Sequence, residues 1–202
     1  MQIAFLDDVC ELEHPPSTST HVLPKLVVYD LDDTIWFPEL YMMAGAPFRK
    51  DVGSREIRDS AGVEIAVYPA ARESMRLIAQ TSEAFRARGT KIAVASRTHR
   101  GKWANDLMAL FEFDDCPSMK DWISYIDIAS GTKMRHFERL RKLSGVPYDD
   151  MLFFDNERDN CVDVAQLGVC CIHCPSGMSQ DAWERGLRLF AELKRASSTV
   201  YQ

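Results

Sequence analysis

The stretch Lys-Leu-Val-Val-Tyr-Asp-Leu-Asp-Asp-Thr, residues 25–34, joins a short apolar run directly to a group of acids. An unbroken apolar run of this kind indicates a strand that is buried on both faces of a sheet. The acids then lie at the carboxyl end of that strand. We therefore expect the first core strand to run up to Tyr29, with Asp30 and Asp32 just beyond it.

The same pattern recurs along the rest of the chain, where apolar runs alternate with segments of helical spacing. Further strands are predicted at about 91–95, 125–129, 151–154 and 169–174. Helices are predicted at about 69–88, 101–111, 132–143, 158–167 and 180–195. Such alternation implies right-handed crossovers and a mainly parallel sheet. The sequence therefore predicts an α/β fold with a doubly wound, Rossmann-like parallel sheet of about five strands and helices on both faces.

Two segments do not fit this alternation. Residues 1–24 contain Pro15, Pro16 and a Ser/Thr run that ends at Pro24, which is typical of an irregular N-terminal arm. Residues 37–67 show no sustained period and are interpreted as a short insertion, or minimal cap. Because 202 residues suffice for one domain and are marginal for two, we expect a single domain over residues 25–202.

The composition argues against some kinds of binding partner. Hydrophobic residues make up 46% and charged residues 27% of the chain, as in an ordinary globular protein. The formal net charge of −6 argues against nucleic acid or an anionic membrane as a general partner. The N-terminus lacks the pattern of a secretory signal, and no apolar stretch approaches the length that spans a bilayer. We expect a soluble, cytoplasmic protein.

The six cysteines are scattered, apart from Cys170, Cys171 and Cys174 around His173. Without a secretion signal, reduced thiols are the preferred interpretation. Thiolates and imidazole are also zinc ligands. Strand alternation, however, puts Cys170 and Cys174 on one face and Cys171 and His173 on the other. A buried apolar strand is therefore favoured over a zinc site.

Polar residues follow each predicted strand. Two acids one residue apart, Asp30 and Asp32, can divide the work of nucleophile and proton carrier. Hydroxyl, guanidinium and ammonium groups that suit phosphoryl oxygens follow the next two strands, at Ser96, Arg97 and Lys133. Oxygen ligands of the kind that magnesium prefers follow the fourth, at Asp155, Asn156, Glu157 and Asp159. The last two are equally explained as acids that stabilise a helix N-terminus.

At this point the sequence resembles the haloacid dehalogenase superfamily of aspartate-nucleophile phosphatases. Its four motifs stand in order, as Asp-x-Asp-x-Thr at 30–34, Ser96, Lys133, and the pair at 155–156. The segments LVVYDLDDTIW (26–36), VASRT (94–98), GTKMRHFERL (131–140), LFFDNERDN (152–160) and LGVCCIH (167–173) more closely resemble the eukaryotic magnesium-dependent phosphatases. The likeness extends from about Lys25 to Met178.

The resemblance implies a magnesium-dependent phosphomonoesterase that works through an aspartyl-phosphate. It implies Asp30 as nucleophile and magnesium ligand, and Asp32 as general acid/base with its backbone carbonyl on the metal. It assigns phosphate binding to Leu31, Ser96, Arg97 and Lys133, and further magnesium ligation to Asn156 and Asp155. Thr34 is expected to brace the first loop. The implied substrate is a phosphorylated small molecule or a phosphoprotein, particularly a sugar phosphate or phosphotyrosine.

Two positions depart from the closer family, which usually has an acid pair in the last motif and a tyrosine at the position of Asp33. Asn156 replaces one acid, so the metal site loses a negative charge while an amide oxygen remains available. The departure bears on metal affinity more than on reaction class. Whether Asn156, Asp155 or Asp159 is the direct ligand stays open.

Other functions remain open on the sequence alone. A noncatalytic phosphate-binding scaffold could retain the fold, although loss of Asp30 or Asp32 would be its best sign, and both are present. A phosphotransferase would use the same motifs. Near the expected site, the basic group His99, Arg100 and Lys102 and the aromatic group Trp36, Phe37 and Tyr41 are explained as well by solvation and packing as by substrate contact.

Overall fold

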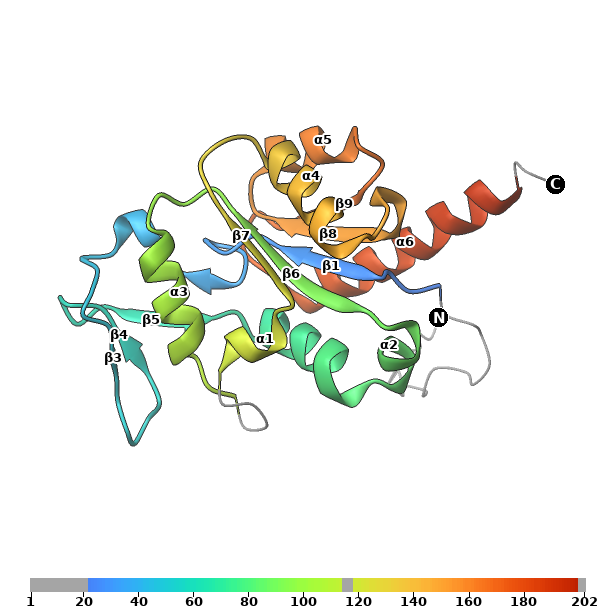
Figure 1. The fold of residues 1–202 in the computed structure, drawn as a ribbon. Helices are drawn as coiled ribbons and strands as arrows, with labels where there is room; N and C mark the ends of the chain where they lie inside the picture. The colour runs from blue at the N-terminus through green and yellow to red at the C-terminus, as the bar shows by residue number, and fades with distance from the viewer. Residues whose placement is uncertain (1–21, 114–117, 200–202) are drawn as a thin grey trace, which may run out of the picture.

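The structure is a computed structural model and describes residues 22–113 and 118–199. Its centre is a five-stranded parallel sheet with the order β7-β6-β1-β8-β9 (Figure 1). The strands are β1 (Leu26–Tyr29), β6 (Lys91–Ser96), β7 (Tyr125–Ile128), β8 (Met151–Asp155) and β9 (Cys170–His173). All four pairings between neighbours are parallel, which confirms the predicted sheet.

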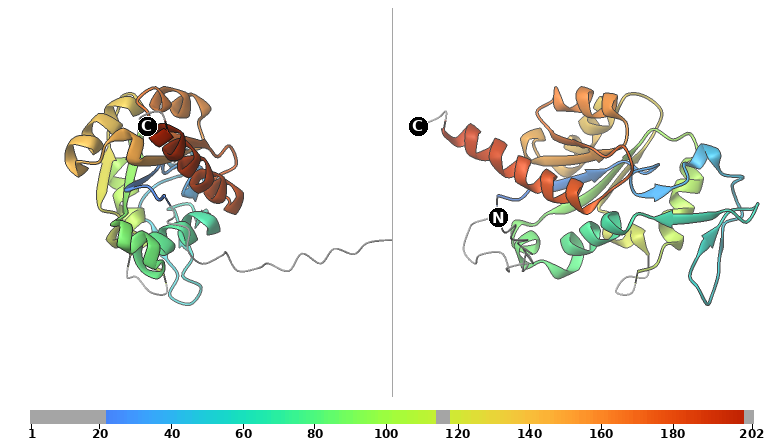
Figure 2. Two further views of the ribbon diagram at one scale, coloured as in Figure 1. Left: turned by 90° about the vertical axis from the view of Figure 1, so that its right-hand side faces the viewer. Right: turned by 180° about the vertical axis from the view of Figure 1, so that it is seen from behind.

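Helices cover both faces of this sheet (Figures 1 and 2). They are α1 (Pro69–Arg76), α2 (Glu83–Arg88), α3 (Gly101–Leu110), α4 (Lys133–Ser144), α5 (Arg158–Ala165) and α6 (Gln180–Thr199). Side chains of α4 and α5 pack with Val28 and Phe153 on one face. Side chains of α1, α2, α3 and α6 pack with Tyr29 and Phe154 on the other. Burial on both faces explains why the core strands consist almost entirely of apolar residues.

The helix predicted over residues 69–88 is interrupted, so this prediction is wrong in its interior. It consists of α1, a wide turn η2 (Leu77–Thr81) and α2. Ser82 has an extended backbone, with φ −90° and ψ 115°, and its side chain accepts a hydrogen bond from the N–H of Phe85. Ser82 is therefore the N-cap of a new helix. Gly89, with φ 70° in the left-handed region, is the C-cap of α2.

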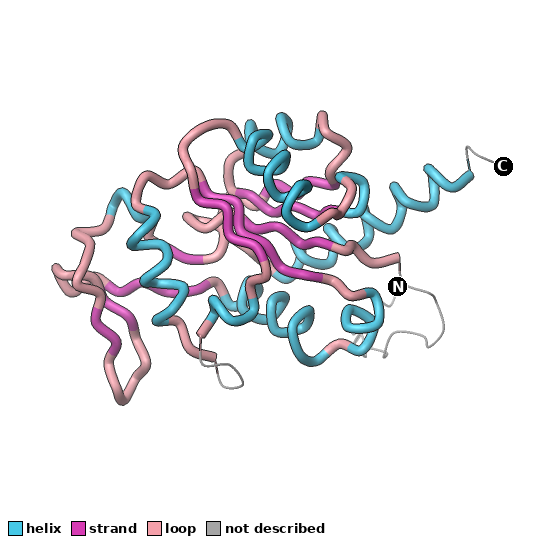
Figure 3. Tube along the Cα trace, in the orientation of Figure 1, coloured by secondary structure: helices cyan, strands magenta, loops and turns pink. Residues whose placement is uncertain are grey.

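The insertion has more structure than its sequence indicates. It forms a small antiparallel sheet with the order β2-β5-β4-β3, shown by the short strands beside α3 in Figure 3. Its elements are β2 (Trp36–Phe37), a 3₁₀ turn η1 (Leu40–Met42), β3 (Arg49–Lys50), β4 (Ile57–Arg58) and β5 (Glu64–Val67). Three of the four strands have only two residues, too few to produce a detectable period in sequence.

The ends of the described chain bear on two further expectations. Most of the predicted N-terminal arm lies outside the described residues, whereas Leu23 and Pro24 are buried and contact the segment before β6.

In β9, Cys170 and Ile172 are buried and the residues between and after them are half-buried, as alternation predicts. Among the described residues no helix combines the length and apolar character needed to cross a bilayer.

Candidate active site

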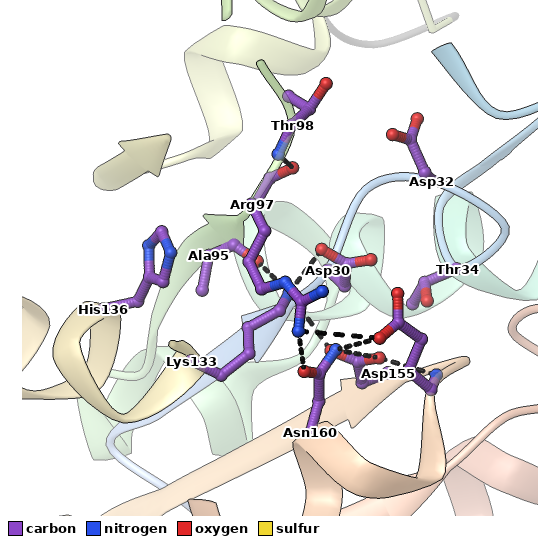
Figure 4. Close-up of polar contacts among 12 residues, drawn as sticks. Asp30, Asp32, Thr34, Ala95, Arg97, Thr98, Lys133, His136, Asp155 and Asn160 are labelled. Atoms are coloured by element: carbon purple, nitrogen blue, oxygen red, sulfur yellow. Dashed lines mark hydrogen bonds and ion pairs between the residues drawn. The ribbon is translucent and has the colours of Figure 1, made fainter. Parts of the chain in front are cut away.

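The predicted site residues gather at the carboxyl ends of the three central strands. β1 lies between β6 and β8, so Asp30 is flanked by the residues that follow those two strands. Lys133, the first residue of α4, reaches the same point from the far side of β6 (Figure 4). The motifs that are far apart in sequence therefore meet at one end of the sheet, where ligands bind in folds of this type.

A buried ion cluster forms the floor of the site. Lys133 Nζ donates to Asp30 Oδ1 at 2.5 Å and lies 3.1 Å from Asp155 Oδ2. It also donates to the carbonyl oxygen of Ala95 at 2.6 Å. The side chains of Lys133 and Asp155 are almost inaccessible to solvent, and that of Asp30 is only slightly exposed. One ammonium group therefore compensates two buried carboxylates.

Burial and this imbalance of charge shift the pKa values of Asp30 and Lys133. Burial raises the pKa of Asp30 to about 7, although Lys133 acts in the opposite direction and Asp155 adds to the rise. Desolvation lowers the pKa of Lys133, but the two carboxylates outweigh it and the net shift is upward. The floor therefore carries one negative charge too many when both acids are ionised, a condition that a bound cation would relieve.

Two hydrogen-bond donors hold the side chain of Asp32 in the first loop, the loop that follows β1. Asp32 Oδ1 accepts hydrogen bonds from Trp36 Nε1 at 2.9 Å and from the N–H of Leu40 at 3.1 Å. In Figure 4 the Asp32 carboxylate stands away from the ion cluster and faces the open side of the site. Burial raises its pKa, while the bonds from Trp36 and Leu40 oppose the rise. An acid with a raised pKa at the mouth is suited to deliver a proton.

Thr34 joins the first loop to the last. Its hydroxyl oxygen accepts the N–H of Asn156 at 3.0 Å, so it braces the two loops as expected. On the other side of this loop, His173 Nε2 lies 3.0 Å from the carbonyl oxygen of Asn156. Sequence analysis treated His173 only as a core residue; its position on β9, beside β8, is what brings it to this loop.

The segment after β6 provides hydroxyl and guanidinium groups. Ser96 is buried, and its Oγ accepts the N–H of Thr98 at 3.3 Å. Because α3 begins only at Gly101, Ser96 is not the N-cap of that helix. Arg97 extends from the end of β6 toward α5 and donates to Asn160 Oδ1 at 2.9 Å.

The residues of the last motif differ in their access to the site. Asp155 is fully buried, and its oxygens accept from Lys133, Asn160 and the N–H of Glu157. Asn156 is half-buried and lines the cavity, whereas Asp159 is exposed and does not. Leu31 is also fully buried, so only its backbone could reach a bound phosphate.

These groups surround an open cavity of about 610 Å³. Its walls are lined by Asp30, Asp32, Glu39, Tyr41, Ser96, Arg97, Thr98, His99, Arg100, Gly131, Lys133, Asn156, Glu157 and Asn160. Lys102, the third residue of the predicted basic group, instead pairs with Asp106. The sequence pattern marked neither Glu39 nor Asn160 as a residue of the site. Burial and the neighbouring Asp33 raise the pKa of Glu39 to about 7.

The donor set fits a hard divalent cation. The carboxylate of Asp30 and the amide of Asn156 face the same cavity, next to the first loop that carries the backbone carbonyl of Asp32. All of these donors are oxygen, the ligand type that magnesium prefers. Among the described residues, no group of three or more His, Cys, Asp or Glu side chains is placed to hold a metal, so backbone and amide oxygens would have to complete the set.

Comparison with known proteins agrees with this geometry. The sequence model of the Acid Phosphatase family matches residues 22–193. The chain is 36% identical over 170 residues to human Magnesium-dependent phosphatase 1, a match that covers 84% of this chain and 89% of that protein. It is 32% identical over 150 residues to a HAD-like hydrolase superfamily protein of Schizosaccharomyces pombe, covering 72% of this chain and 83% of that protein.

A solved structure supports the fold. The haloacid dehalogenase-like family hydrolase of Xanthomonas campestris matches with a TM-score of 0.55 at 12% identity, covering 86% of this chain and 99% of that one. At that identity the likeness concerns the arrangement of strands and helices. Because the family match spans most of the chain, including all four strand-end motifs, the chain belongs to the Acid Phosphatase family of haloacid dehalogenase-like phosphatases.

Proposed function

We propose that this protein is a magnesium-dependent phosphomonoesterase that works through an aspartyl-phosphate on Asp30. The observation that carries the proposal is the placement of Asp30 on the floor of an open cavity, in contact with a buried lysine. That placement gives a carboxylate nucleophile a fixed position and a cation beside it. The related human protein is named as a magnesium-dependent phosphatase, which supports the choice of metal.

The chemistry follows from the positions of the side chains. An Asp30 oxygen attacks phosphorus in line with the ester oxygen, forming the Asp30–phosphorus bond as the phosphorus–ester bond breaks. Asp32, at the mouth, gives its proton to the leaving oxygen. It then takes a proton from the water that attacks the aspartyl-phosphate, so that inorganic phosphate leaves and both aspartates return to their starting state. Lys133, Ser96 and Arg97 hold the phosphoryl oxygens.

Asp30, the backbone carbonyl of Asp32 and the Asn156 side chain would hold magnesium. When bound there, it supplies positive charge against the phosphoryl oxygens. Asp155 is assigned to fixing Lys133, because its oxygens already accept three protein donors and it does not line the cavity.

The insertion leaves the cavity open, so that it can admit a phosphorylated protein side chain as well as a small phosphate ester. Tyr41, at 72% exposed, belongs to the insertion, whereas His99 and Arg100 belong to the segment before α3, and all three line the cavity. We propose phosphotyrosine-type protein side chains or sugar phosphates as substrates. The same geometry would serve a phosphotransferase if an acceptor other than water entered the open mouth.

Replacement of the nucleophile tests the reaction class. Asp30→Asn keeps the shape of the side chain but removes the nucleophilic carboxylate, so phosphate release should fall by at least about a thousandfold. Circular dichroism should show an intact fold. The test substrates are a panel of phosphomonoesters with magnesium. Release near the wild-type rate would remove Asp30 from this role, and a wild-type protein inactive on every substrate would favour a phosphate-binding scaffold.

Metal exchange tests the cofactor. Activity should disappear after exhaustive chelation, return with magnesium and be suppressed by calcium. Calcium takes more ligands at longer distances, so it can hold the Asp30 carboxylate in a two-oxygen contact unsuited to attack. Full activity in the chelated protein would show that the reaction needs no metal.

A further inference from the structure

Asn160 connects the guanidinium group of Arg97, which lines the cavity, to the buried ion cluster of Lys133, Asp30 and Asp155. It is the third residue of α5, and its side chain is buried. Its Oδ1 accepts from Arg97 Nη1 at 2.9 Å, and its Nδ2 donates to both oxygens of Asp155 at 3.1 Å. Arg97, Asn160, Asp155 and Lys133 thus form a continuous series of polar contacts that ends at Asp30 (Figure 4).

An amide at position 160 suits the chemistry of both its neighbours, Arg97 and Asp155. A guanidinium group only donates and a carboxylate only accepts, so the residue between them must present an acceptor to one and a donor to the other. Asn160 does so without adding charge. An aspartate of the same shape would place a second carboxylate against Asp155, which is fully buried.

The strand order shows what this bridge does to Arg97. Arg97 follows β6, and Asn160 lies on α5, which follows β8. Since β1 lies between β6 and β8, a side chain that runs from one to the other crosses the carboxyl end of β1, where Asp30 stands. A bond to Asn160 therefore holds the guanidinium across the site. The Arg97 side chain is 46% exposed, and besides this hydrogen bond its Nη1 lies 3.7 Å from Glu157 Oε2, a longer and more exposed contact.

We propose that Asn160 is a positioning residue for the phosphatase reaction, which fixes Arg97 across the phosphate site and fixes the Asp155 carboxylate that anchors Lys133. The inference rests on the proposed function, because it gives Arg97 and Lys133 their roles toward phosphate. Asn160 itself does not act on the reacting atoms. Its effect is to present two cations in a fixed arrangement before the substrate arrives.

A double-mutant cycle with Asn160→Ala and Arg97→Ala tests this coupling. Steady-state kinetics give KM and kcat, and calorimetry gives the affinity of the magnesium-loaded protein for inorganic phosphate. Loss of one hydrogen bond to a charged group corresponds to roughly a tenfold effect. We expect Asn160→Ala to weaken phosphate binding and raise KM by about that factor. We expect the loss in the double variant to be smaller than the sum of the two single losses, because without Arg97 only the contact of Asn160 with Asp155 still contributes.

The matched control is Asn105→Ala. Asn105 also lies on a helix and also bridges two groups, the carbonyl of Gly101 and the ammonium of Lys120, but it does not line the cavity. Its removal should leave KM and phosphate affinity unchanged. If Asn160→Ala fails to fold, Asn160→Ser replaces it, because a serine hydroxyl can still donate to Asp155 but is too short to meet Arg97 as well.

Different results would contradict the role of Asn160 and the proposed phosphatase activity. Additive effects in the cycle, or a lower kcat with unchanged KM and phosphate affinity, would overturn the positioning role while the enzyme remains a phosphatase. Unchanged phosphate affinity in Arg97→Ala would overturn it too. A wild-type protein that binds phosphate but releases none from any ester would instead overturn the proposed function, and the calorimetric cycle would still decide the role of Asn160.

Discussion

Asn156 bears on the charge of the proposed magnesium site. It takes the place of a carboxylate in the last motif, lines the cavity and is held by Thr34 and His173. Its side-chain oxygen is a neutral donor, whereas hard divalent cations bind anionic oxygen more tightly. At the proposed site this amide would attract magnesium less strongly than a carboxylate would, while the loop that carries it stays braced.

Asn156→Asp should lower the magnesium concentration that gives half-maximal activity, by roughly tenfold for one added ligand charge. The added charge also repels the phosphoryl group, so the rate at saturating magnesium should fall. Activity is to be titrated against magnesium at saturating substrate, with Asp159→Asn as a charge control on the exposed side of α5. An unchanged midpoint in Asn156→Asp would count against Asn156 as a ligand and leave Asp155 as the candidate for that role.

At the scale of elements, the long segments could be predicted from sequence and the short ones could not. The central core strands are runs of apolar residues because both their faces are covered, and the candidate catalytic groups could be found because they follow these runs. Three strands of the insertion have two residues each and carry no such signal. The bond between Trp36 and Asp32, and the bridge made by Asn160, depend on how the loops fold back, so no local pattern marks them.

The buried carboxylate of Asp59 joins several backbone segments of the insertion, whose apolar side chains, such as Ile57 and Ile65, also pack into the main core. Asp59 accepts the N–H groups of Ala44, Ala61 and Val63 at 2.7, 3.0 and 2.9 Å. Although burial acts to raise the pKa of Asp59, these bonds outweigh it and lower the pKa. Glu39 and Tyr41 precede this segment, so the order of the insertion sets one wall of the cavity.

Asp59→Ala should leave three backbone donors without their partner and destabilise the insertion by about 2 kcal/mol. Hydrogen exchange should accelerate at residues 44, 61 and 63 and remain slow in β1. The matched control is Asp51→Ala at the exposed hairpin turn, where Asp51 also accepts backbone N–H groups. There the change in stability should be much smaller, because water can bond to the exposed N–H groups that Asp51 leaves. Equal protection of the insertion in Asp59→Ala and wild type would refute this role.

At the scale of the whole molecule, the cavity and a group of ion pairs around Asp150 lie at opposite ends of the sheet. The cavity lies at the carboxyl ends of the strands. At the amino ends, Asp150 is buried and contacts Lys25 before β1 at 3.0 Å, Arg88 at the end of α2 at 3.3 Å and Lys194 of α6 at 2.7 Å. One carboxylate therefore ties together elements from both halves of the sequence, away from the site, and its removal can be read as a change in stability alone.

The pH dependence of that contribution follows from the ionisation of Asp150. Burial acts to raise its pKa, but the bonds from Lys194 and Lys25 outweigh burial and lower it. A carboxyl whose folded pKa lies below its unfolded value of about 3.9 stabilises the fold above that pH. The contribution is then lost as the pH falls through the folded pKa, because the protonated group no longer attracts its cations.

Asp150→Asn should therefore lower the free energy of unfolding by about 2 kcal/mol at neutral pH, the scale of hydrogen bonds to charged groups. Asparagine does not titrate, so the difference from wild type should stay constant from about pH 8 to pH 5 and shrink below about pH 4. Urea denaturation of both proteins across this range measures the difference, and other titrating groups cancel because they are common to both. The kcat of the variant should equal that of wild type under native conditions, since Asp150 lies at the other end of the sheet. A stability difference that persists unchanged at pH 3 would mean that the charge of Asp150 contributes nothing and that its packing alone holds the three elements together.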